Sequence, residues 1–496
     1  MTIASRTAPL ALRRTAGQAR RVPPPPLLAT ALAAAFAAGT ALRFWSLGTR
    51  PGWQYDEGVY TEVAANLLRH GTINEHITYG AAWSPDLYQP PFYFLVLARW
   101  FALTGVSIYH ARVLGAACSL TALVLLWRLL CRLHGPSVAA RAMIPIALDG
   151  WLLYVQRVSY MENALLLLVV AGMLAYQQAL DNPATARFAA AGVVLGLATA
   201  FKYTGVYVIG TVLLCWLITG RNHLRHLALL GSAIAALAAC IGFEVAWLDT
   251  GGHNWWFQDT LLQVRRVLGI QSSGGTLTSP GAAIHLLLAE YDVFVPSFLI
   301  AFVAVCMAVW RLWRCYRARD WRPVSDNALL WSWMVAGLVI FGSSSLRFPQ
   351  YFALILVPAY AWFWTEARHW RLRPALRGAL IATACVAGIA SFSGRVAAYH
   401  DNVFAQVQAY ATTRIPRGTV VVADEAIGDL ISQPYCREQE AGPCAGVARY
   451  AITWDTYLQT TWDLGDPAYR EMMAGAVRLR SWTGFNGTVT VWRLRP

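Results

Sequence analysis

The sequence has few charged residues. Asp, Glu, Lys and Arg make up 13% of its 496 residues, whereas a soluble protein of this length carries about a quarter. Hydrophobic residues make up 57%, and they come in blocks of about 20, the length of an α-helix that crosses a bilayer. The composition therefore excludes an ordinary soluble globular protein and predicts a polytopic membrane protein.

Acidic residues are scarcer than basic ones: 26 stand against 40, which gives a net charge of +14. Such a charge is common in nucleic-acid-binding proteins, but here the arginines gather in short hydrophilic gaps between the apolar blocks. These gaps alternate with gaps that are richer in acids and aromatics, as the positive-inside rule describes. Membrane topology explains the basic balance, so no nucleic-acid partner is expected.

Motifs for several common chemistries are missing. The chain has no Walker-type phosphate loop and no Gly-x-Ser-x-Gly motif, and the pair Gly274-Gly275 is too little for a nucleotide loop. No Cys-His spacing resembles a zinc site. A soluble nucleotide donor is therefore not expected, which favours a lipid-borne substrate.

The apolar blocks form about eleven candidate membrane spans. If the N-terminus lies inside, every arginine-rich gap falls on the cytoplasmic side and the chain ends outside. We therefore expect a multi-pass protein of the plasma (inner) membrane with a cytoplasmic tail at 1–26, a membrane domain at 27–396 and an extracytoplasmic domain at 397–496. The candidate spans are 27–47, 109–131, 138–156, 161–180, 186–201, 203–219, 226–248, 293–311, 327–345, 350–365 and 375–395.

The first outer loop, at 48–108, contains two helical patterns. From Asp56 to Leu68 the apolar residues have helical spacing, and Gly71 ends the helix. An apolar stretch at 92–103 is short for a span and contains Arg99. It predicts an interfacial or re-entrant helix, and an ordinary span is the alternative.

The residues after about 397 have a different pattern. The stretches 419–423 and 488–492 are typical of buried strands, and helical pieces lie between them, so we expect a small α/β domain. Cys436 and Cys444 are the two cysteines of this polar tail. On the oxidising outer side we expect a disulfide between them, the alternative being two unrelated thiols.

Two adjacent carboxylates, Asp56 and Glu57, come soon after the first span. Charged side chains at the edge of a membrane core are costly and usually functional. One carboxylate can take a proton from an acceptor hydroxyl, and two can hold a divalent cation. The structural alternative is a helix N-terminus, where acids interact with the positive end of the helix dipole.

Lys202 is the only lysine, so the other 39 of the 40 basic residues are arginines. It lies between two apolar runs on the expected outer side, where a compact ammonium suits a phosphate group; a snorkelling lysine is the alternative. Other charged residues fall at the same face, and each alone is typical of an interface anchor. Together they suit a phosphate-linked lipid: Arg112, Arg157, Glu162 and Arg347.

The order of these pieces resembles a known family. Five pieces in this order are similar to the GT-C glycosyltransferases. They are Tyr55-Asp56-Glu57-Gly58-Val59-Tyr60, Pro90-Pro91-Phe92-Tyr93, Arg112 at the head of the next span, 196–203 and 347–351. More narrowly, it resembles glycosyltransferase family 39, the protein O-mannosyltransferase and aminoarabinose transferase group. The resemblance covers about residues 45–365 and implies an α-helical polytopic membrane protein of GT-C type.

The resemblance implies a cell-envelope enzyme that moves a hexosyl or pentosyl group from a polyprenyl-phosphate donor to an extracytoplasmic glycan, lipid or protein acceptor, with inversion. Asp56 would be the catalytic carboxylate and Glu57 its neighbour in the acceptor or metal environment. Lys202 and Arg347 would hold the donor phosphate. The resemblance assigns no cofactor, and a divalent metal is the alternative. Residues that would line the cavity or the acceptor side are Tyr60, Arg112, Arg157 and Glu162.

The sequence departs from the family at two positions. Asp149 stands where relatives often carry proline, and Gln89 precedes Pro90 where protein mannosyltransferases have a histidine, which puts a protein acceptor in doubt. The rival class is a lipid or sugar transporter or flippase, which would show repeated halves and charges near the bilayer midplane. Here the charges lie at one face and no repeat is visible.

Overall fold

The computed structural model describes most of the chain. The described residues are 23–71, 73, 90–220, 223–248, 261, 265, 292–321, 324, 326–343, 349–370, 372–398, 402–428, 430–438, 441–455, 467–484 and 487–495. Arg347 and nearly all of the outer loop at 249–292 therefore lie outside the described residues.

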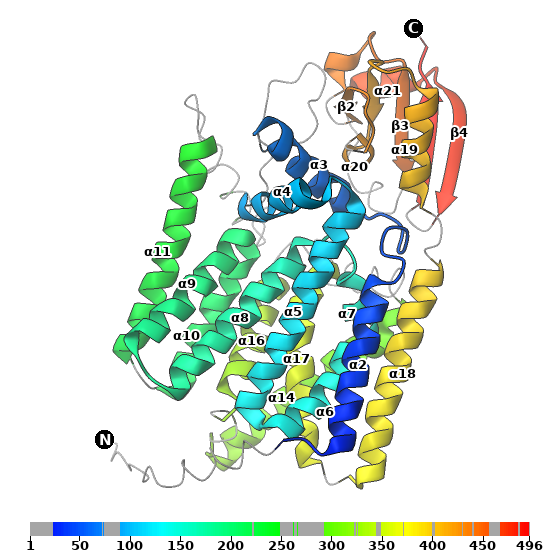
Figure 1. Ribbon diagram of the computed structural model, residues 1–496. Coiled ribbons are helices and arrows are strands. Elements are labelled where there is room, and N and C mark those ends of the chain that lie inside the picture. The colour runs from blue at the N-terminus through cyan, green and yellow to red at the C-terminus, as the bar shows by residue number, and fades with distance from the viewer. Residues whose placement is uncertain are drawn as a thin grey trace.

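Membrane-length helices dominate the described part of the chain. Six of them are long and apolar enough to cross a membrane, and Figure 1 shows them in one bundle with shorter apolar helices. The six are α2 (Pro26–Phe44), α5 (Ile108–His134), α8 (Met161–Asp181), α11 (His223–Leu248), α14 (Val295–Ala318) and α18 (Pro374–Ala398). The shorter ones include α9 (Thr185–Phe201), α10 (Tyr207–Thr219), α16 (Ala328–Ser343) and α17 (Phe352–Glu366).

The span expected at 138–156 is wrong as a single helix. It is divided into α6 (Pro136–Ala147) and α7 (Gly150–Val155). Asp149 caps α7 by accepting a hydrogen bond from the backbone N–H of Leu152 at 2.9 Å, and Ser297 Oγ donates to its Oδ2 at 2.7 Å. A buried carboxylate thus begins a new helix inside an apolar run, and this capping role accounts for Asp149.

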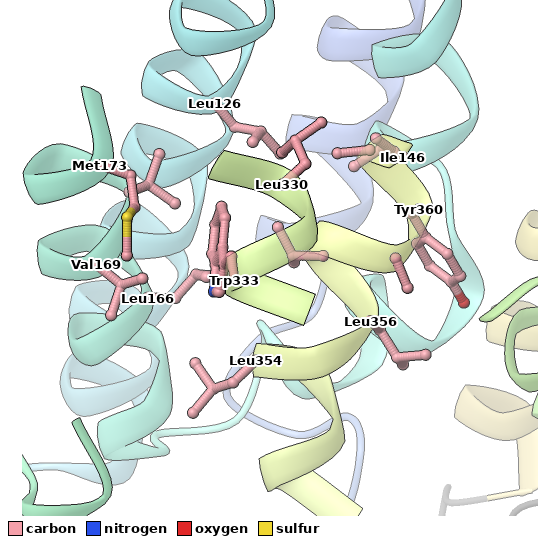
Figure 2. Close-up of a cluster of buried hydrophobic side chains, with 14 of the residues drawn as sticks. Leu126, Ile146, Leu166, Val169, Met173, Leu330, Trp333, Leu354, Leu356 and Tyr360 are labelled. Carbon is pink, nitrogen blue, oxygen red and sulfur yellow. The ribbon is translucent and has the colours of Figure 1, made fainter. Parts of the chain in front are cut away.

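The core of the membrane domain lies between α5, α8, α16 and α17. Trp333 of α16 is fully buried, and its Nε1 donates to the hydroxyl of Tyr207 at 3.1 Å. Because lipid tails are as apolar as these side chains, close packing rather than water exclusion holds such helices together. Figure 2 shows part of this core, with Leu126, Ile146, Leu166, Val169, Met173, Leu330, Leu354, Leu356 and Tyr360 around the tryptophan.

Helix α9 packs against α11 through two glycines. A Cβ atom on Gly192 would lie 2.1 Å from the carbonyl oxygen of Leu229, and one on Gly196 would lie 2.4 Å from that of Ala233. Small residues four positions apart let the two backbones approach this closely. The contact fixes the axis of α9, which ends at Phe201 and has Lys202 as its C-cap.

Two helices of the loop at 48–108, expected to lie outside, are found at one end of the bundle. α3 (Tyr55–His70) begins with a capping box, in which Glu57 Oε2 accepts from the backbone N–H of Gln54 at 2.9 Å, and it ends at Gly71, whose φ is 72°. α4 (Phe92–Thr104) packs against α3 and lies crosswise to the bundle in Figure 1. This orientation fits an interfacial helix.

Short 3-10 helices join several of the longer ones. η1 (Tyr203–Val206) follows α9 directly after Lys202, and η4 (Pro349–Tyr351), which carries Gln350 and Tyr351 of the site described below, precedes α17. η3 (Asp292–Phe294) leads into α14, and η5 (Ala367–His369) follows α17. Such single turns change the chain direction without leaving long irregular backbone in the bilayer.

The C-terminal part forms the small α/β domain that the sequence predicts. Its five strands have the order β2-β1-β3-β5-β4, with β1 parallel to β2 and β3 and with antiparallel pairing from β3 through β5 to β4. Cys436 and Cys444 are joined by a disulfide, with their Cα atoms 6.3 Å apart. The elements are α19 (Val403–Arg414), β1 (Val421–Ala423), α20 (Glu425–Gly428), β2 (Tyr435–Arg437), η7 (Gly442–Cys444), β3 (Tyr450–Asp455), α21 (Pro467–Met473), β4 (Val477–Gly484) and β5 (Gly487–Arg493).

The C-terminal domain contacts the first outer loop. α20 touches α3, as Figure 1 also shows, and the side chain of Trp53 packs against the apolar cluster that Val421, Ile427 and Val491 help to form. The segment that leads into α3 is thereby held between the membrane domain and the C-terminal domain.

Candidate functional site

Asp56 lies in the first turn of α3 and is half-buried. The hydroxyl of Tyr60 donates to its Oδ2 at 3.4 Å, and Gln350 Nε2 donates to the same atom at 3.2 Å. Tyr60 lies one helical turn after Asp56 on the same face of α3, whereas Gln350 comes from η4, 294 positions along the chain. The tertiary fold therefore brings a distant amide to this carboxylate.

Lys202 forms a buried ion pair with Glu162. The distance between Nζ and Glu162 Oε1 is 2.7 Å, and the two side chains are only 2% and 3% exposed. Glu162 lies in the first turn of α8, and the ammonium group stands 4.9 Å from the centre of the Tyr351 ring. The α8 and α9 helices, which pack side by side, thus bring these charges to the level of η4.

Asp56 interacts electrostatically with the ion pair of Lys202 and Glu162. Burial raises the pKa of Asp56 to about 6; the positive charge of Lys202 opposes this rise and the negative charge of Glu162 adds to it. A carboxylate with a pKa near neutrality can both take up and release a proton under physiological conditions. Among the described residues, Glu162 Oε2 is buried and has no hydrogen-bond partner, so this cluster retains an acceptor for a ligand.

Glu57, expected as a second catalytic carboxylate, pairs with Arg112. Its side chain is fully buried and forms a two-point ion pair with Arg112, at 2.7 Å to Nε and 2.6 Å to NH2. The backbone N–H groups of Gln54 and Ser159 donate to the same carboxylate at 2.9 and 2.8 Å. Since both oxygens are engaged, Glu57 has a structural role in this arrangement.

Arg112, expected to line the cavity, is engaged by Glu57 and by backbone carbonyl oxygens. Its side chain is fully buried, and its remaining N–H groups donate to the carbonyl oxygens of Leu47, Pro51 and Gly52 at 2.8 to 3.1 Å. The Glu57–Arg112 pair therefore fixes the loop between α2 and α3, and with it the start of the helix that carries Asp56.

Arg157, also expected to line the cavity, contacts the end of α2. Its guanidinium donates to the carbonyl oxygens of Leu42, Trp45 and Arg50, with 2.7 Å to the last, and it stands 5.3 Å from the centre of the Phe392 ring. An arginine that satisfies the last carbonyls of a helix holds the C-terminal end of α2. The hydrogen-bond partners of this guanidinium are thus backbone carbonyl oxygens.

Sequence reasoning did not assign Gln350 and Tyr351. Both follow Arg347 in the stretch 347–351 that carries the family resemblance, and this position was the one available sign of their involvement. Arg347 itself, expected to hold the donor phosphate, lies outside the described residues. Among the described residues no group of three or more His, Cys, Asp or Glu side chains is placed to hold a metal ion.

Part of the chain matches a known protein family. Residues 88–247 match the family model of the dolichyl-phosphate-mannose-protein mannosyltransferases, a region that contains Glu162 and Lys202 and ends before η4. The comparison with curated protein sequences gives no match.

Two solved structures show a similar fold. The structure of ArnT from Cupriavidus metallidurans bound to undecaprenyl phosphate has a TM-score of 0.65 at 14% identity, over 92% of this chain and 97% of that one. The archaeal oligosaccharyltransferase AglB from Archaeoglobus fulgidus, in complex with an inhibitory peptide and a dolichol-phosphate, has a TM-score of 0.55 at 12% identity, over 94% of this chain and 74% of that one. The chain therefore has the GT-C fold of these membrane proteins, and its residues 88–247 resemble the dolichyl-phosphate-mannose-protein mannosyltransferases.

Proposed function

We propose that the chain transfers a sugar from a polyprenyl-phosphate donor to an acceptor on the outer face of the plasma (inner) membrane, with an inside N-terminus, the membrane domain at 27–396 and an outside C-terminal domain at 397–496. The observation that carries the proposal is the cluster of Asp56, Glu162 and Lys202 at the bundle end where α4 lies crosswise. Undecaprenyl phosphate and dolichol-phosphate in the ArnT and AglB structures support a lipid phosphate as the leaving group.

In the proposed reaction, Asp56 acts as the base. It takes the proton of an acceptor hydroxyl as that oxygen forms a bond to the anomeric carbon. The bond between this carbon and the phosphate oxygen breaks, and the lipid phosphate leaves with the electron pair. Because the acceptor attacks from the side opposite the phosphate, the configuration at the anomeric carbon inverts.

Lys202 is proposed to stabilise the leaving phosphate. An ammonium has three N–H donors, and the bond to Glu162 uses one of them. Negative charge grows on the phosphate during bond cleavage, so a fixed cation there stabilises the transition state more than the ground state. We propose Arg347 as a second cation for the same phosphate. Glu162, by holding the ammonium in place, acts as a positioning residue, and Tyr60 and Gln350 orient the Asp56 carboxylate.

The proposal is tested with purified protein in liposomes that contain labelled polyprenyl-phosphate sugars and membrane extracts as acceptors. We expect Asp56→Asn to lose transfer by about 100-fold or more, since loss of a general base removes 10²–10⁴ in rate, and to keep the wild-type melting temperature. Glu62→Gln, on the same helix, is the matched control and should retain activity. Wild-type transfer by Asp56→Asn would reject the assignment.

The same liposomes address the transporter alternative and the open question of a metal. A flippase would move labelled lipid between leaflets without forming a glycosylated product, whereas the proposed enzyme forms product and releases polyprenyl phosphate. Transfer that is lost with a chelator and restored by Mn²⁺ or Mg²⁺ would assign a metal to the acceptor side, where Asp56 lies beside Glu162.

A further inference from the structure

A pocket with a basic lining lies at the opposite end of the bundle from α3. Arg141 of α6, Arg368 of η5 and Arg377 of α18 converge on it from three elements. Figure 1 shows α3 at one end of the bundle and the first turns of α6 and α18 at the other. This arginine pocket, defined by the three arginines, is therefore separate from the site around Asp56.

The positive charge of the arginine pocket is not compensated by its own lining. None of the described residues that line it is acidic; the others are apolar and include Val138, Trp364 and Ile381. The neighbouring carboxylate, Glu366, is engaged by Arg311 and by Asn327. Arg368 is already engaged, since its Nε donates to His369 Nε2 at 2.9 Å. The guanidinium groups of Arg141 and Arg377 carry like charges, so an anion between them would stabilise both.

Arg377 gives an independent sign of a ligand. Its NH2 group donates to the carbonyl oxygen of Trp370 at 3.0 Å, which fixes the orientation of the guanidinium. Its Nε is buried, and among the described residues it has no hydrogen-bond partner. A buried N–H without an acceptor is unfavourable. A phosphate oxygen would satisfy it, because the planar guanidinium fork matches phosphate geometry.

The surface beside the arginine pocket suits an acyl chain. Leu376 and Leu380 of α18 are 50% and 39% exposed, and they adjoin Arg377 and Ile381 in the sequence. Basic pockets between membrane helices on the cytoplasmic side bind the headgroups of anionic lipids. We propose that the arginine pocket binds the headgroup phosphate of an anionic glycerophospholipid whose acyl chains lie along α18.

The test measures lipid binding to the purified full-length protein in a neutral detergent. Phosphatidylglycerol, phosphatidylcholine and inorganic phosphate are added separately. Bound lipid is counted by native mass spectrometry, and the melting temperature is measured in a thermal unfolding experiment. We expect phosphatidylglycerol to bind and to raise the melting temperature, with little effect of the other two. Arg141→Gln/Arg377→Gln should weaken phosphatidylglycerol binding about tenfold or more. Arg373→Gln is the matched control, because Arg373 is exposed and does not line the pocket.

Three results would overturn the proposal: equal binding of phosphatidylcholine, full stabilisation by inorganic phosphate alone, or unchanged phosphatidylglycerol binding by the double variant. Should the glutamine variant fail to fold, Arg141→Lys/Arg377→Lys keeps the charge and removes the planar fork. We then expect this variant to bind phosphatidylglycerol more weakly than the wild type does, but more strongly than it binds phosphatidylcholine. Wild-type affinity for phosphatidylglycerol would contradict the role of the arginines. The outcome is independent of glycosyl transfer, since binding is measured without donor or acceptor.

Discussion

The neighbouring carboxylates Asp56 and Glu57 have different partners in this molecule. Successive residues of a helix point about 100° apart, so Asp56 faces Tyr60 and Gln350 while Glu57 faces Arg112. The sequence pair Asp-Glu indicates chemistry at this position, but it does not tell which carboxylate is engaged by an arginine from another helix. Only the partners distinguish a base from a structural anion.

The first prediction concerns the pH dependence of transfer. Asp56 must be ionised to accept a proton, and burial raises its pKa to about 6. We expect kcat/KM to fall below about pH 6, by about tenfold per pH unit at the acid end. Glu162→Gln removes a negative charge that raises this pKa, so the acid limb should move to lower pH. An acid limb at the same pH in both proteins would contradict the coupling.

The second prediction separates the structural carboxylate from the catalytic one. Glu57→Gln leaves the buried guanidinium of Arg112 without its counter-charge, which typically costs about 3–5 kcal/mol of stability. We expect a lower melting temperature in detergent for Glu57→Gln and an unchanged one for Asp56→Asn. If Glu57→Gln melts like the wild type and has lost only activity, Glu57 belongs to the reaction after all.

Part of the site could be predicted from single residues and part could not. A lone lysine among arginines indicates a special position, and Lys202 does lie in the charged cluster. Arg157, in contrast, looks equally suited to a cavity, but its partners are backbone carbonyl oxygens of the last turn of α2 and of the segment after it. The sequence contains no record of which carbonyls remain unsatisfied at a helix end, so this contact requires the three-dimensional structure.

At the scale of elements, the position of Lys202 depends on helix packing. α9 has little room to shift, because its glycines touch the backbone of α11. The apolar pattern predicted both helices, since apolar length alone indicates a span. It did not predict the break at Asp149, because a single polar residue in an apolar run can cap a new helix or lie within an old one.

The third prediction tests this packing. Gly196→Leu would force α9 away from α11, because even a Cβ atom meets the carbonyl oxygen of Ala233 at 2.4 Å. We expect a lower melting temperature and a loss of transfer of about tenfold or more, since a displacement of about 1 Å of a catalytic group can cost 10²-fold. Gly231→Leu on α11 is the control, because among the described residues no atom outside its own helix backbone lies within 4 Å of the added Cβ. Equal activity of both variants would contradict the role of the contact.

At the scale of the whole molecule, the proposed topology rests on the alternation of arginine-rich gaps. The structure places the arginine pocket and the Asp56 cluster at opposite ends of the bundle, as that alternation requires. The small C-terminal domain was predicted from two strand patterns. Its contact with α3 was not, because Trp53 in a loop does not indicate which apolar cluster will bury it.

The fourth prediction tests the side on which the C-terminal domain lies. Cys436 and Cys444 are disulfide-bonded, so a membrane-impermeant maleimide added to intact cells should label them only after mild reduction. Cys436→Ser/Cys444→Ser, with the same treatment, sets the background from the other cysteines. Label that appears at these positions only after the cells are permeabilised would place the domain inside and reverse the topology.

The burial of Trp53 in the apolar cluster of the C-terminal domain has a consequence for protein engineering. Trp53 stands three positions before Asp56 in the sequence. In a chimera that receives the C-terminal domain of a relative, Trp53 therefore packs against an apolar cluster of different sequence, even though the membrane helices are unchanged. Exchanging the domain together with the loop at 48–54 should give an active hybrid more often than exchanging the domain alone.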